Sequence, residues 1–280
     1  MSVPGSPAPA MTSQSFDSLS AYLGSRVTLQ HDGSTEVVIP GADRLSDADG
    51  HLSELAILCA IDIATGMGSV AATDPPMVTL TADMAVNLLA RPAPGDLRTV
   101  GRVVKPGKRI IMTEAVVTDS TGSPVAFATV SCAPVKEIPR GFAGRIQPGD
   151  TRVLDLPEWA SVPIEQQYDT TPVEVAGSGP VPVASIELTP RTANPFGFLH
   201  GAVGAHLLLS GARRAGLAQV DSITVRYLRP TVEGPADVIV DDVFRSHPST
   251  ALSMSLRDRG TGKIACAAHV VGPSAQFATR

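Results

Sequence analysis

An internal repeat constrains the fold of this chain more than any other feature of its 280 residues. Residues 50–53 (GHLS) correspond to residues 197–200 (GFLH), 147 positions later, and each quartet precedes an apolar stretch. Further along, residues 86–92 (VNLLARP) resemble residues 225–230 (VRYLRP). A chain of this length has room for two domains, so the repeat predicts one unit built twice.

Each half is expected to contain one apolar helix followed by four strands that turn signals separate. A helix that is apolar almost all round, followed by antiparallel strands, predicts an α+β fold in which the sheet wraps around the helix. Two such halves side by side would cover each other's sheet edges. The predicted helices cover residues 53–72 and 201–217; the predicted strands cover residues 78–90, 96–104, 109–118 and 125–133, and then 222–228, 236–244, 251–258 and 264–271.

Two segments without clear periodicity divide the chain. Residues 1–15 are rich in Pro, Ser, Gly and Ala and are expected to form a disordered tail. Residues 137–179 are expected to form a linker between a first domain at 16–136 and a second at 180–273.

Composition excludes several classes of protein. The net charge of −5 and the lack of a basic block argue against a nucleic-acid partner. No apolar run comes near the roughly 20 residues that cross a bilayer, and the start of the chain has neither a basic nor an apolar leader segment, so a cytoplasmic protein without a membrane partner is expected. Cys59, Cys132 and Cys266 lack metal-binding spacing and are predicted to be buried thiols.

Asp62 is the one acid in the interior of the apolar helix predicted for the first half, beyond Glu54 at the helix start. Burying a carboxylate without partners is costly, so either the side chain lies at an exposed helix edge or it serves chemistry. The repeat places Leu209 at the corresponding position of the second half, which shows that packing alone accepts leucine. Asp62 is therefore a candidate general base, with a raised pKa or a hydrogen-bonded environment suited to that role.

The second half carries a complementary motif, NPFGFLHGA, at residues 194–202. His200 stands at the predicted helix start, where the first half has Ser53, a residue far better suited to capping. Free backbone N–H groups and the positive end of the helix dipole would polarise a carbonyl there and stabilise an oxyanion. Gly201 would let a ligand approach the backbone closely.

This motif resembles the hotdog-fold thioesterase superfamily, in particular its phenylacetyl-CoA (PaaI-like) branch. That pattern is Asn, then G-x-L-H-G-G, then an acid nine residues after the His. The second half matches it at Asn194, Gly197, Leu199, His200 and Gly201. The first half matches the acid, Asp62, nine residues after Ser53, and resembles the family's following strand at residues 78–96 (VTLTADMAVNLLARPAPGD). Ala202 replaces the family's second glycine, which is expected to narrow the pocket near the carbonyl.

The resemblance implies a tandem double hotdog and an acyl-CoA thioesterase. Family active sites lie between two subunits, with the Asn, His and Gly from one and the acid from the other. Here one composite site would combine Asn194, His200 and Gly201 with Asp62, whereas the second would pair Ser53 with Leu209 and be inactive. The resemblance also places an assisting hydroxyl at Thr81, although an ordinary strand threonine is an open alternative.

The implied reaction needs no cofactor, since CoA is part of the substrate. Histidines other than His200 show no metal-ligand spacing. Basic residues that could bind CoA phosphates are Lys105, Lys108, Arg109, Arg91 and Arg229, each of which could equally be a solvated surface charge. The alternatives are a non-catalytic acyl-CoA or acyl-carrier binding protein, an enoyl-CoA hydratase or dehydratase, and a structural partner in a larger assembly. Two chains are expected to associate as a homodimer.

Overall fold

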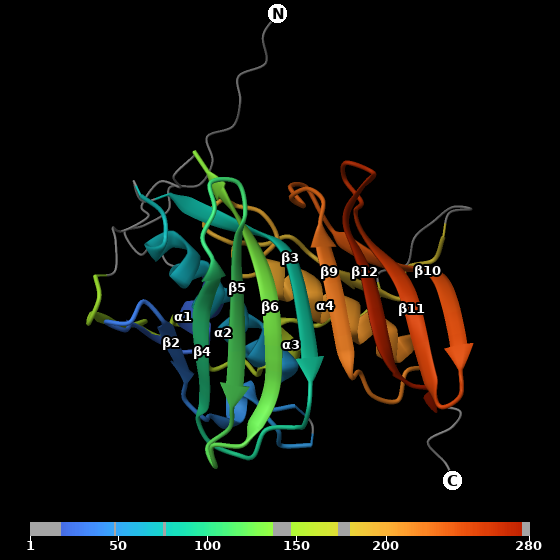
Figure 1. Cartoon of the computed structure of the whole chain (residues 1–280). Helices are drawn as coiled ribbons and strands as arrows, with labels where there is room; N and C mark the ends of the chain where they lie inside the picture. The colour runs from blue at the N-terminus through green and yellow to red at the C-terminus, as the bar shows by residue number, and fades with distance from the viewer. Residues whose placement is uncertain (1–17, 48, 75–76, 137–146, 173–179, 276–280) are drawn as a thin grey trace, which may run out of the picture.

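Two similar halves share one continuous antiparallel sheet of twelve strands. The computed structural model describes residues 18–47, 49–74, 77–136, 147–172 and 180–275. The strand order is β7-β1-β2-β4-β5-β6-β3-β9-β12-β11-β10-β8, and Figure 1 shows the first half, in blue and green, meeting the second, in orange and red, where β3 lies beside β9. Both the α+β class and the double hotdog architecture are confirmed.

The element bounds follow the repeat. The first half contains α1 Ser18–Tyr22, β1 Arg26–Leu29, β2 Thr35–Ile39, the 3-10 turn Asp43–Leu45, α2 Glu54–Ala71, β3 Val78–Leu88, β4 Leu97–Lys105, β5 Ile111–Thr118 and β6 Pro124–Val135. The connecting segment contains β7 Thr151–Val153 and α3 Ile164–Gln167. The second half contains β8 Ala184–Ile186, α4 Gly201–Arg214, β9 Ser222–Tyr227, β10 Ala236–Ser246, β11 Ser249–Asp258 and β12 Lys263–Pro273.

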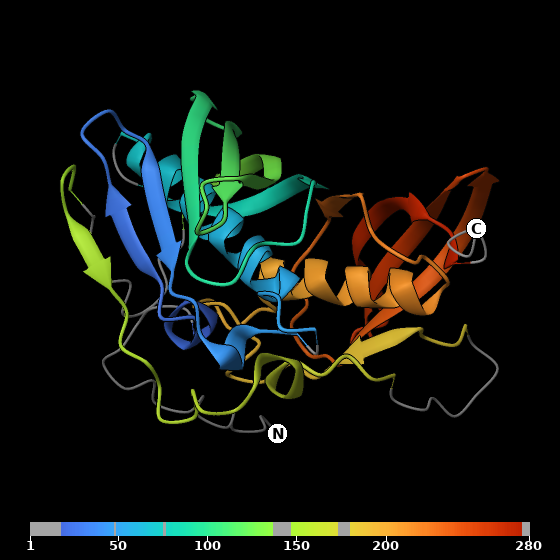
Figure 2. The same cartoon turned by 90° about the horizontal axis from the view of Figure 1, so that it is seen from below.

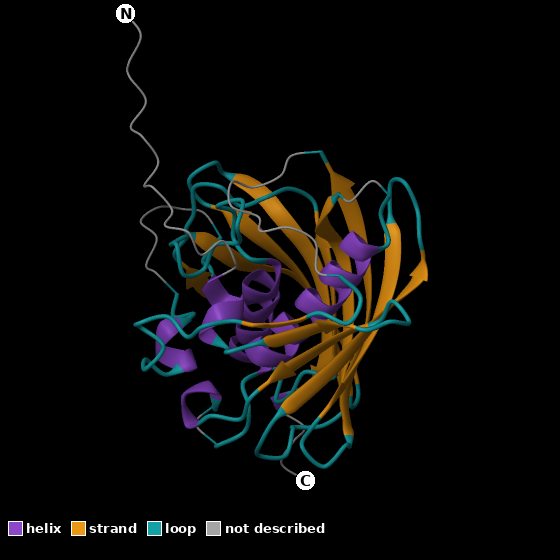
Figure 3. Ribbon diagram, turned by 90° about the vertical axis from the view of Figure 1, so that its left-hand side faces the viewer, coloured by secondary structure: helices purple, strands orange, loops and turns teal. Residues whose placement is uncertain are grey.

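Helices α2 and α4 lie on the concave side of the sheet and contact each other (Figures 2 and 3). Strand β5 alternates buried and exposed positions, which is the period that one covered sheet face demands. In α2, Leu55, Leu58 and Ile61 are fully buried. Truncating one such side chain to alanine typically costs about 2 to 5 kcal/mol of stability. The two helices therefore form the centre of the core.

By length and composition alone, α2 is apolar enough to cross a membrane, and it is the one such helix among the described residues. This corrects the expectation that no apolar run comes near that length. Since 61% of its 18-residue apolar window is buried inside the protein, the apolar character of α2 is accounted for by its place in the core.

The loops that lead into the two central helices have the same geometry. Isolated bridges join Ser46 to Leu52 and Ala193 to Leu199, again 147 positions apart. Gly50 and Gly197 have φ values of 82° and 80°, in the left-handed region that favours glycine. The loop geometry, and not only the order of elements, is thus duplicated.

The seam between the halves is an antiparallel pairing of β3 with β9, which runs from Asp83 opposite Arg226 to Asn87 opposite Ser222. An ion pair of 2.6 Å joins Arg226 Nη1 to Asp83 Oδ1 across it. This pairing sets α2 of one half and the start of α4 of the other within reach of each other.

The described part of the predicted linker, residues 147–172, packs against the first half and also reaches the second, where the hydroxyl of Tyr168 donates to the carbonyl of Arg191. Strand β7 pairs with β1, and the ring of Trp159 stacks on Tyr22 with centroids 5.2 Å apart. The hydroxyl of Tyr22 donates to the carbonyl of Val162 at 2.6 Å. The predicted tail lies outside the described residues, and the predicted domain boundaries stay a prediction.

Candidate active site

Asp62 and His200 lie together, although 138 positions separate them in the sequence. Asp62 is in the third turn of α2 and His200 immediately precedes α4, and 3.7 Å separates Asp62 Oδ2 from His200 Nδ1. The two side chains are only 14% and 7% exposed, so Asp62 does not lie at an exposed helix edge. The structure thus brings together the acid of one half and the imidazole of the other.

Thr81, in β3, donates its hydroxyl hydrogen to Asp62 Oδ1 at 2.6 Å. This bond fixes one carboxylate oxygen and leaves Oδ2 as the oxygen that faces the second half. A hydroxyl donor stabilises the ionised carboxylate, as a base requires. Thr81 thus lies in hydrogen-bond contact with the candidate base, and its role in catalysis stays a prediction.

His200 caps α4, which its residue type did not predict. Its Nδ1 accepts a hydrogen bond from the backbone N–H of Ala202 at 3.1 Å, as Ser53 Oγ accepts from Leu55 N–H at 3.3 Å in the other half. Because Nδ1 is the acceptor, the neutral imidazole carries its hydrogen on Nε2. The cap therefore selects a tautomer that offers a donor at Nε2.

Gly201 is the first residue of α4, so its N–H has no partner inside the helix by position. A Cβ at Gly201 would lie 3.4 Å from Asp62 Oδ2 and 3.6 Å from the hydroxyl of Tyr227. The carboxylate of Asp62, the phenol of Tyr227 and the start of α4 thus meet at Gly201. Ala202 is fully buried and is not among the residues that line the cavity, so its methyl group packs in the core instead of narrowing the cavity.

Asn194 organises the loop that leads to His200. Its Oδ1 accepts from the N–H groups of Phe196 at 3.0 Å and Phe198 at 3.2 Å. Asp47, the counterpart in the first half, accepts from two backbone N–H groups in the same pattern, at 3.0 Å each. An acid can therefore shape this loop, and the side-chain NH2 is the part of Asn194 that the loop does not require.

A cavity of about 380 Å³ opens beside these residues. Such a volume is within the range of small-molecule sites. The wall is mainly apolar, and its apolar members come from α2, β3, β6, the loop before α4, α4 itself, the loop after β9 and β12: Ile63, Gly66, Met67, Val70, Val78, Leu80, Ala82, Ala133, Val135, Pro195, Phe196, Phe198, Leu199, Gly204, Pro230 and Cys266. All five predicted site residues, Asp62, Thr81, Asn194, His200 and Gly201, also line it.

Tyr227, the last residue of β9, is a cavity-lining residue that the sequence did not single out. Its hydroxyl donates to the carbonyl of Gly201 at 2.9 Å. Burial raises the pKa of Tyr227 well above its ordinary value, so the phenol stays a neutral donor. The only available signal was the repeat, which aligns Tyr227 with Leu88, the last residue of β3.

Of the basic residues proposed for CoA phosphates, Arg229 lines the cavity. Lys105, Lys108 and Arg109 are exposed at the hairpin between β4 and β5 and are not among the lining residues. Arg91 lies outside this cavity, in the second cleft that the repeat relates to it, and its Nη1 lies 2.6 Å from Asp49 Oδ2. The three cysteines are buried and free, as predicted.

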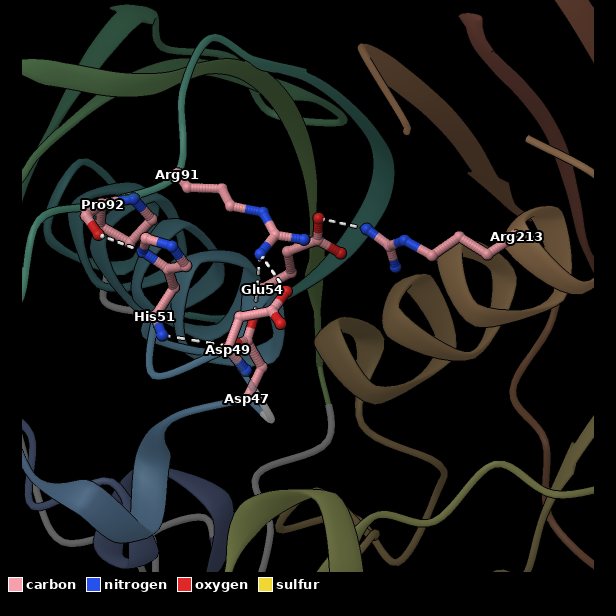
Figure 4. Close-up of polar contacts among 7 residues, drawn as sticks. All are labelled: Asp47, Asp49, His51, Glu54, Arg91, Pro92 and Arg213. Carbon is pink, nitrogen blue, oxygen red and sulfur yellow. Dashed lines mark hydrogen bonds and ion pairs between the residues drawn. The ribbon is translucent and has the colours of Figure 1, made fainter. Parts of the chain in front are cut away.

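The repeat relates this site to a second cleft, where different side chains occupy the corresponding positions (Figure 4). Glu54 stands where the first cleft has Gly201, and Arg213 stands where it has Gly66. These two side chains form an ion pair across the halves. Leu209, the counterpart of Asp62, is fully buried. Two glycines that line the open cleft are thus replaced by charged side chains that bind each other.

The sequence matches no protein-family model and no curated protein. Among solved structures, the chain is similar to an acyl-ACP thioesterase from Bacteroides thetaiotaomicron, with 14% identity, 86% of this chain and 98% of that chain covered, and a TM-score of 0.53. It is also similar to a Lactobacillus plantarum protein provisionally described as an oleoyl thioesterase, with 11% identity, 86% and 96% covered, and a TM-score of 0.56.

These similarities cover both halves of the chain, and at such low identity they establish the fold alone. The fold class is that of the double hotdog, in agreement with the predicted resemblance to the hotdog thioesterase superfamily. Nothing in the comparison specifies the phenylacetyl-CoA branch.

Proposed function

We propose that the protein is an acyl-CoA thioesterase of the PaaI-like type with one composite active site. The observation that carries the proposal is the approach of Asp62 to His200 and Gly201 from opposite halves, at the wall of an apolar cavity. A base opposite a helix N-terminus is the arrangement that hydrolysis of an acyl group requires.

In the proposed reaction the thioester carbonyl lies at the start of α4. The N–H of Gly201 and the Nε2–H of His200 donate to its oxygen, and the amide of Asn194 helps to orient it. Asp62 then either removes a proton from water as the water attacks the carbonyl carbon, or attacks that carbon itself. When water attacks, the C–S bond breaks, the sulfur takes up a proton, and the products are the free acid and CoA. When Asp62 attacks, the same cleavage releases CoA and leaves a mixed anhydride on Asp62, which water then hydrolyses to the free acid and the Asp62 carboxylate.

This chemistry needs no metal or redox cofactor, because backbone and imidazole donors stabilise the developing oxyanion. Thr81 holds Asp62 in place through its hydroxyl. The mainly apolar wall suits an acyl chain. Along α2, Asp62 and Val70 line the cavity eight residues apart, or about 12 Å at 1.5 Å per residue. Since an extended backbone covers about 3.5 Å in three bonds, this stretch suits a linear chain of roughly ten bonds.

The test is thiol release from a panel of acyl-CoA thioesters by wild-type protein, Asp62→Asn and His200→Ala. Either substitution is expected to lower kcat by about 100-fold or more, since each removes a transition-state interaction. Arg91→Gln, in the other cleft, is the matched control and should retain wild-type turnover. Wild-type rates in both site variants would disprove this mechanism.

A single turnover in heavy-oxygen water separates the two roles of Asp62. If Asp62 activates water, the first product acid carries the heavy oxygen. If Asp62 attacks the carbonyl and water then opens the mixed anhydride at the aspartyl carbon, the label enters the enzyme carboxylate and the first product acid lacks it, so an unlabelled first product identifies the nucleophilic role. Tight binding of acyl-CoA without turnover would instead identify a binding protein.

A further inference from the structure

Tyr227 joins the central sheet to the start of α4 at the active site. Its hydroxyl donates to Gly201 O at 2.9 Å, a carbonyl that α-helical geometry also pairs with the N–H of Ala205. Tyr227 is the last residue of β9, one strand away from the β3 residue Thr81 that holds Asp62. The strands at the seam therefore hold both sides of the site, one through each hydroxyl.

The repeat supplies an internal comparison for this position. The last residue of β3 is Leu88, which aligns with Tyr227, and the helix start in that half is Glu54 rather than Gly201. Leucine is therefore sufficient to end the strand and pack beside the helix. The phenol is present only in the half whose helix start faces a carboxylate.

The location of the hydroxyl is specific. It lies 3.6 Å from the position that a Cβ of Gly201 would occupy, and Asp62 Oδ2 lies 3.4 Å from that same position. The bond to Gly201 O therefore holds the peptide group between Gly201 and Ala202. This group is adjacent to the one that carries the proposed oxyanion donor, the N–H of Gly201. A shift of about 1 Å at such a position can lower turnover about 100-fold.

We propose that Tyr227 is a positioning residue of the thioesterase site: its hydroxyl fixes the first turn of α4, so that the Gly201 N–H and the His200 imidazole face Asp62. This inference rests on the proposed function and extends it to a residue outside the resemblance. The phenol acts through the helix start, and not by contact with the thioester.

The test compares Tyr227→Phe with Tyr168→Phe, a buried tyrosine whose hydroxyl donates to the carbonyl of Arg191 at 3.2 Å. Tyr227→Phe keeps the ring and removes only the hydroxyl. It is expected to lower kcat about 10-fold with KM unchanged, because the loss falls on transition-state alignment. Tyr168→Phe is expected to keep both kinetic constants. Amide exchange in the first turn of α4 should accelerate in Tyr227→Phe alone.

A wild-type kcat in Tyr227→Phe would overturn this inference and leave the proposed function standing. An equal loss in Tyr168→Phe would also overturn it, since the effect would then be general destabilisation. Tyr227→Leu, which copies Leu88, is the second variant and should lose kcat at least as strongly while remaining folded. If the wild-type chain hydrolyses no acyl-CoA, the proposed function fails first, and this inference fails with it.

Discussion

The two clefts between α2 and α4 are related by the repeat and are each preceded by a copy of the same loop. One, the open cleft, holds the cavity, and the other, which we call the closed cleft, is bridged by the ion pair of Glu54 with Arg213. The open cleft has Gly201 and Gly66 in its wall, and the closed one has Glu54 and Arg213 at the same positions. In the closed cleft these side chains bind each other across the halves (Figure 4). The difference teaches that a cavity here depends on two missing side chains as much as on the catalytic groups.

The capping residues differ in a second way. Ser53 and His200 both accept a hydrogen bond from the backbone two residues later. The structural task is therefore the same, and only the imidazole adds a donor that can reach a ligand. A reciprocal exchange between clefts can separate packing from chemistry at each position.

The largest expected effect comes from exchanging the two central helix positions. Leu209→Asp places a carboxylate at a fully buried site, where the residue that corresponds to Thr81 is the buried Val220 and offers no hydroxyl. The free energy of unfolding should fall by about 4 kcal/mol or more, from lost packing and an unpaired buried charge. Denaturant titration measures it.

The reciprocal variant is Asp62→Leu. It should be close to neutral or stabilising, since leucine is the residue that packing accepts in the other half, but it should abolish turnover. Equal destabilisation by the two exchanges would contradict the view that Asp62 is kept for chemistry.

The second exchange concerns the caps. His200→Ser keeps a side-chain acceptor for α4 and removes the imidazole, so kcat should fall about 100-fold, equivalent to about 2.7 kcal/mol, with little change in Tm. Ser53→His is the matched control and should leave kcat unchanged. Thioesterase assays and thermal melts measure both. A large loss of Tm in His200→Ser would show that the imidazole is primarily structural.

The third prediction uses His206, which is in α4 beside the closed cleft. Burial lowers the pKa of His206 from 6.5 to about 4, against the opposing effect of Glu54, and Arg213 and Arg214 lower it further. Its Nδ1 has no hydrogen-bond partner. Below pH 6.5 His206 is protonated in the unfolded chain but stays neutral in the folded chain. The free energy of unfolding should therefore fall as the pH drops from 6.5 toward 4.

At pH 5 this loss should be on the order of 2 kcal/mol relative to pH 7. The variant His206→Leu removes the titrating group, so its unfolding free energy should depend less steeply on pH across that window. Urea titrations at pH 7 and pH 5 measure the difference. An unchanged slope in the variant would show that other groups carry the acid sensitivity.

Much of the fold could be predicted because the same pattern, one apolar helix followed by four strands, occurs in both halves of the sequence. The central helix predicted at residues 53–72 is α2 at Glu54–Ala71, and the four strands after each helix occur in the predicted order. Strands β1, β2, β7 and β8 and helices α1 and α3 were not predicted with bounds, since elements of three to five residues carry too little periodicity. The packing of β7 and α3 depends on Trp159 and Tyr22, which are far apart in sequence.

The candidate site was predictable where one half departs from the other. Asp62 has Leu209 as its counterpart and His200 has Ser53. The structure places Asp62 and His200, the two residues without a chemical equivalent in the other half, next to each other. Tyr227 and the pairing of Glu54 with Arg213 depend on which strand end and which helix turn face each other across the seam. No local pattern states that, because it follows from the pairing of β3 with β9.

The smallest expected effect is that of the ion pair in the closed cleft. The side chains of Arg213 and Glu54 are 37% and 26% exposed, so solvent screens their attraction. A double-mutant cycle of Arg213→Gln and Glu54→Gln should give a coupling energy of about 0.5 to 1 kcal/mol that declines at high salt. Turnover should not change, because neither residue lines the open cavity.

Replacing both with glycine should open the second cleft without creating activity, because Ser53 and Leu209 still occupy the catalytic positions. Acyl-CoA hydrolysis at a second site in that variant would contradict the assignment of the catalytic groups, and a coupling energy above about 2 kcal/mol would show that the pair holds the halves together more strongly than an exposed salt bridge can.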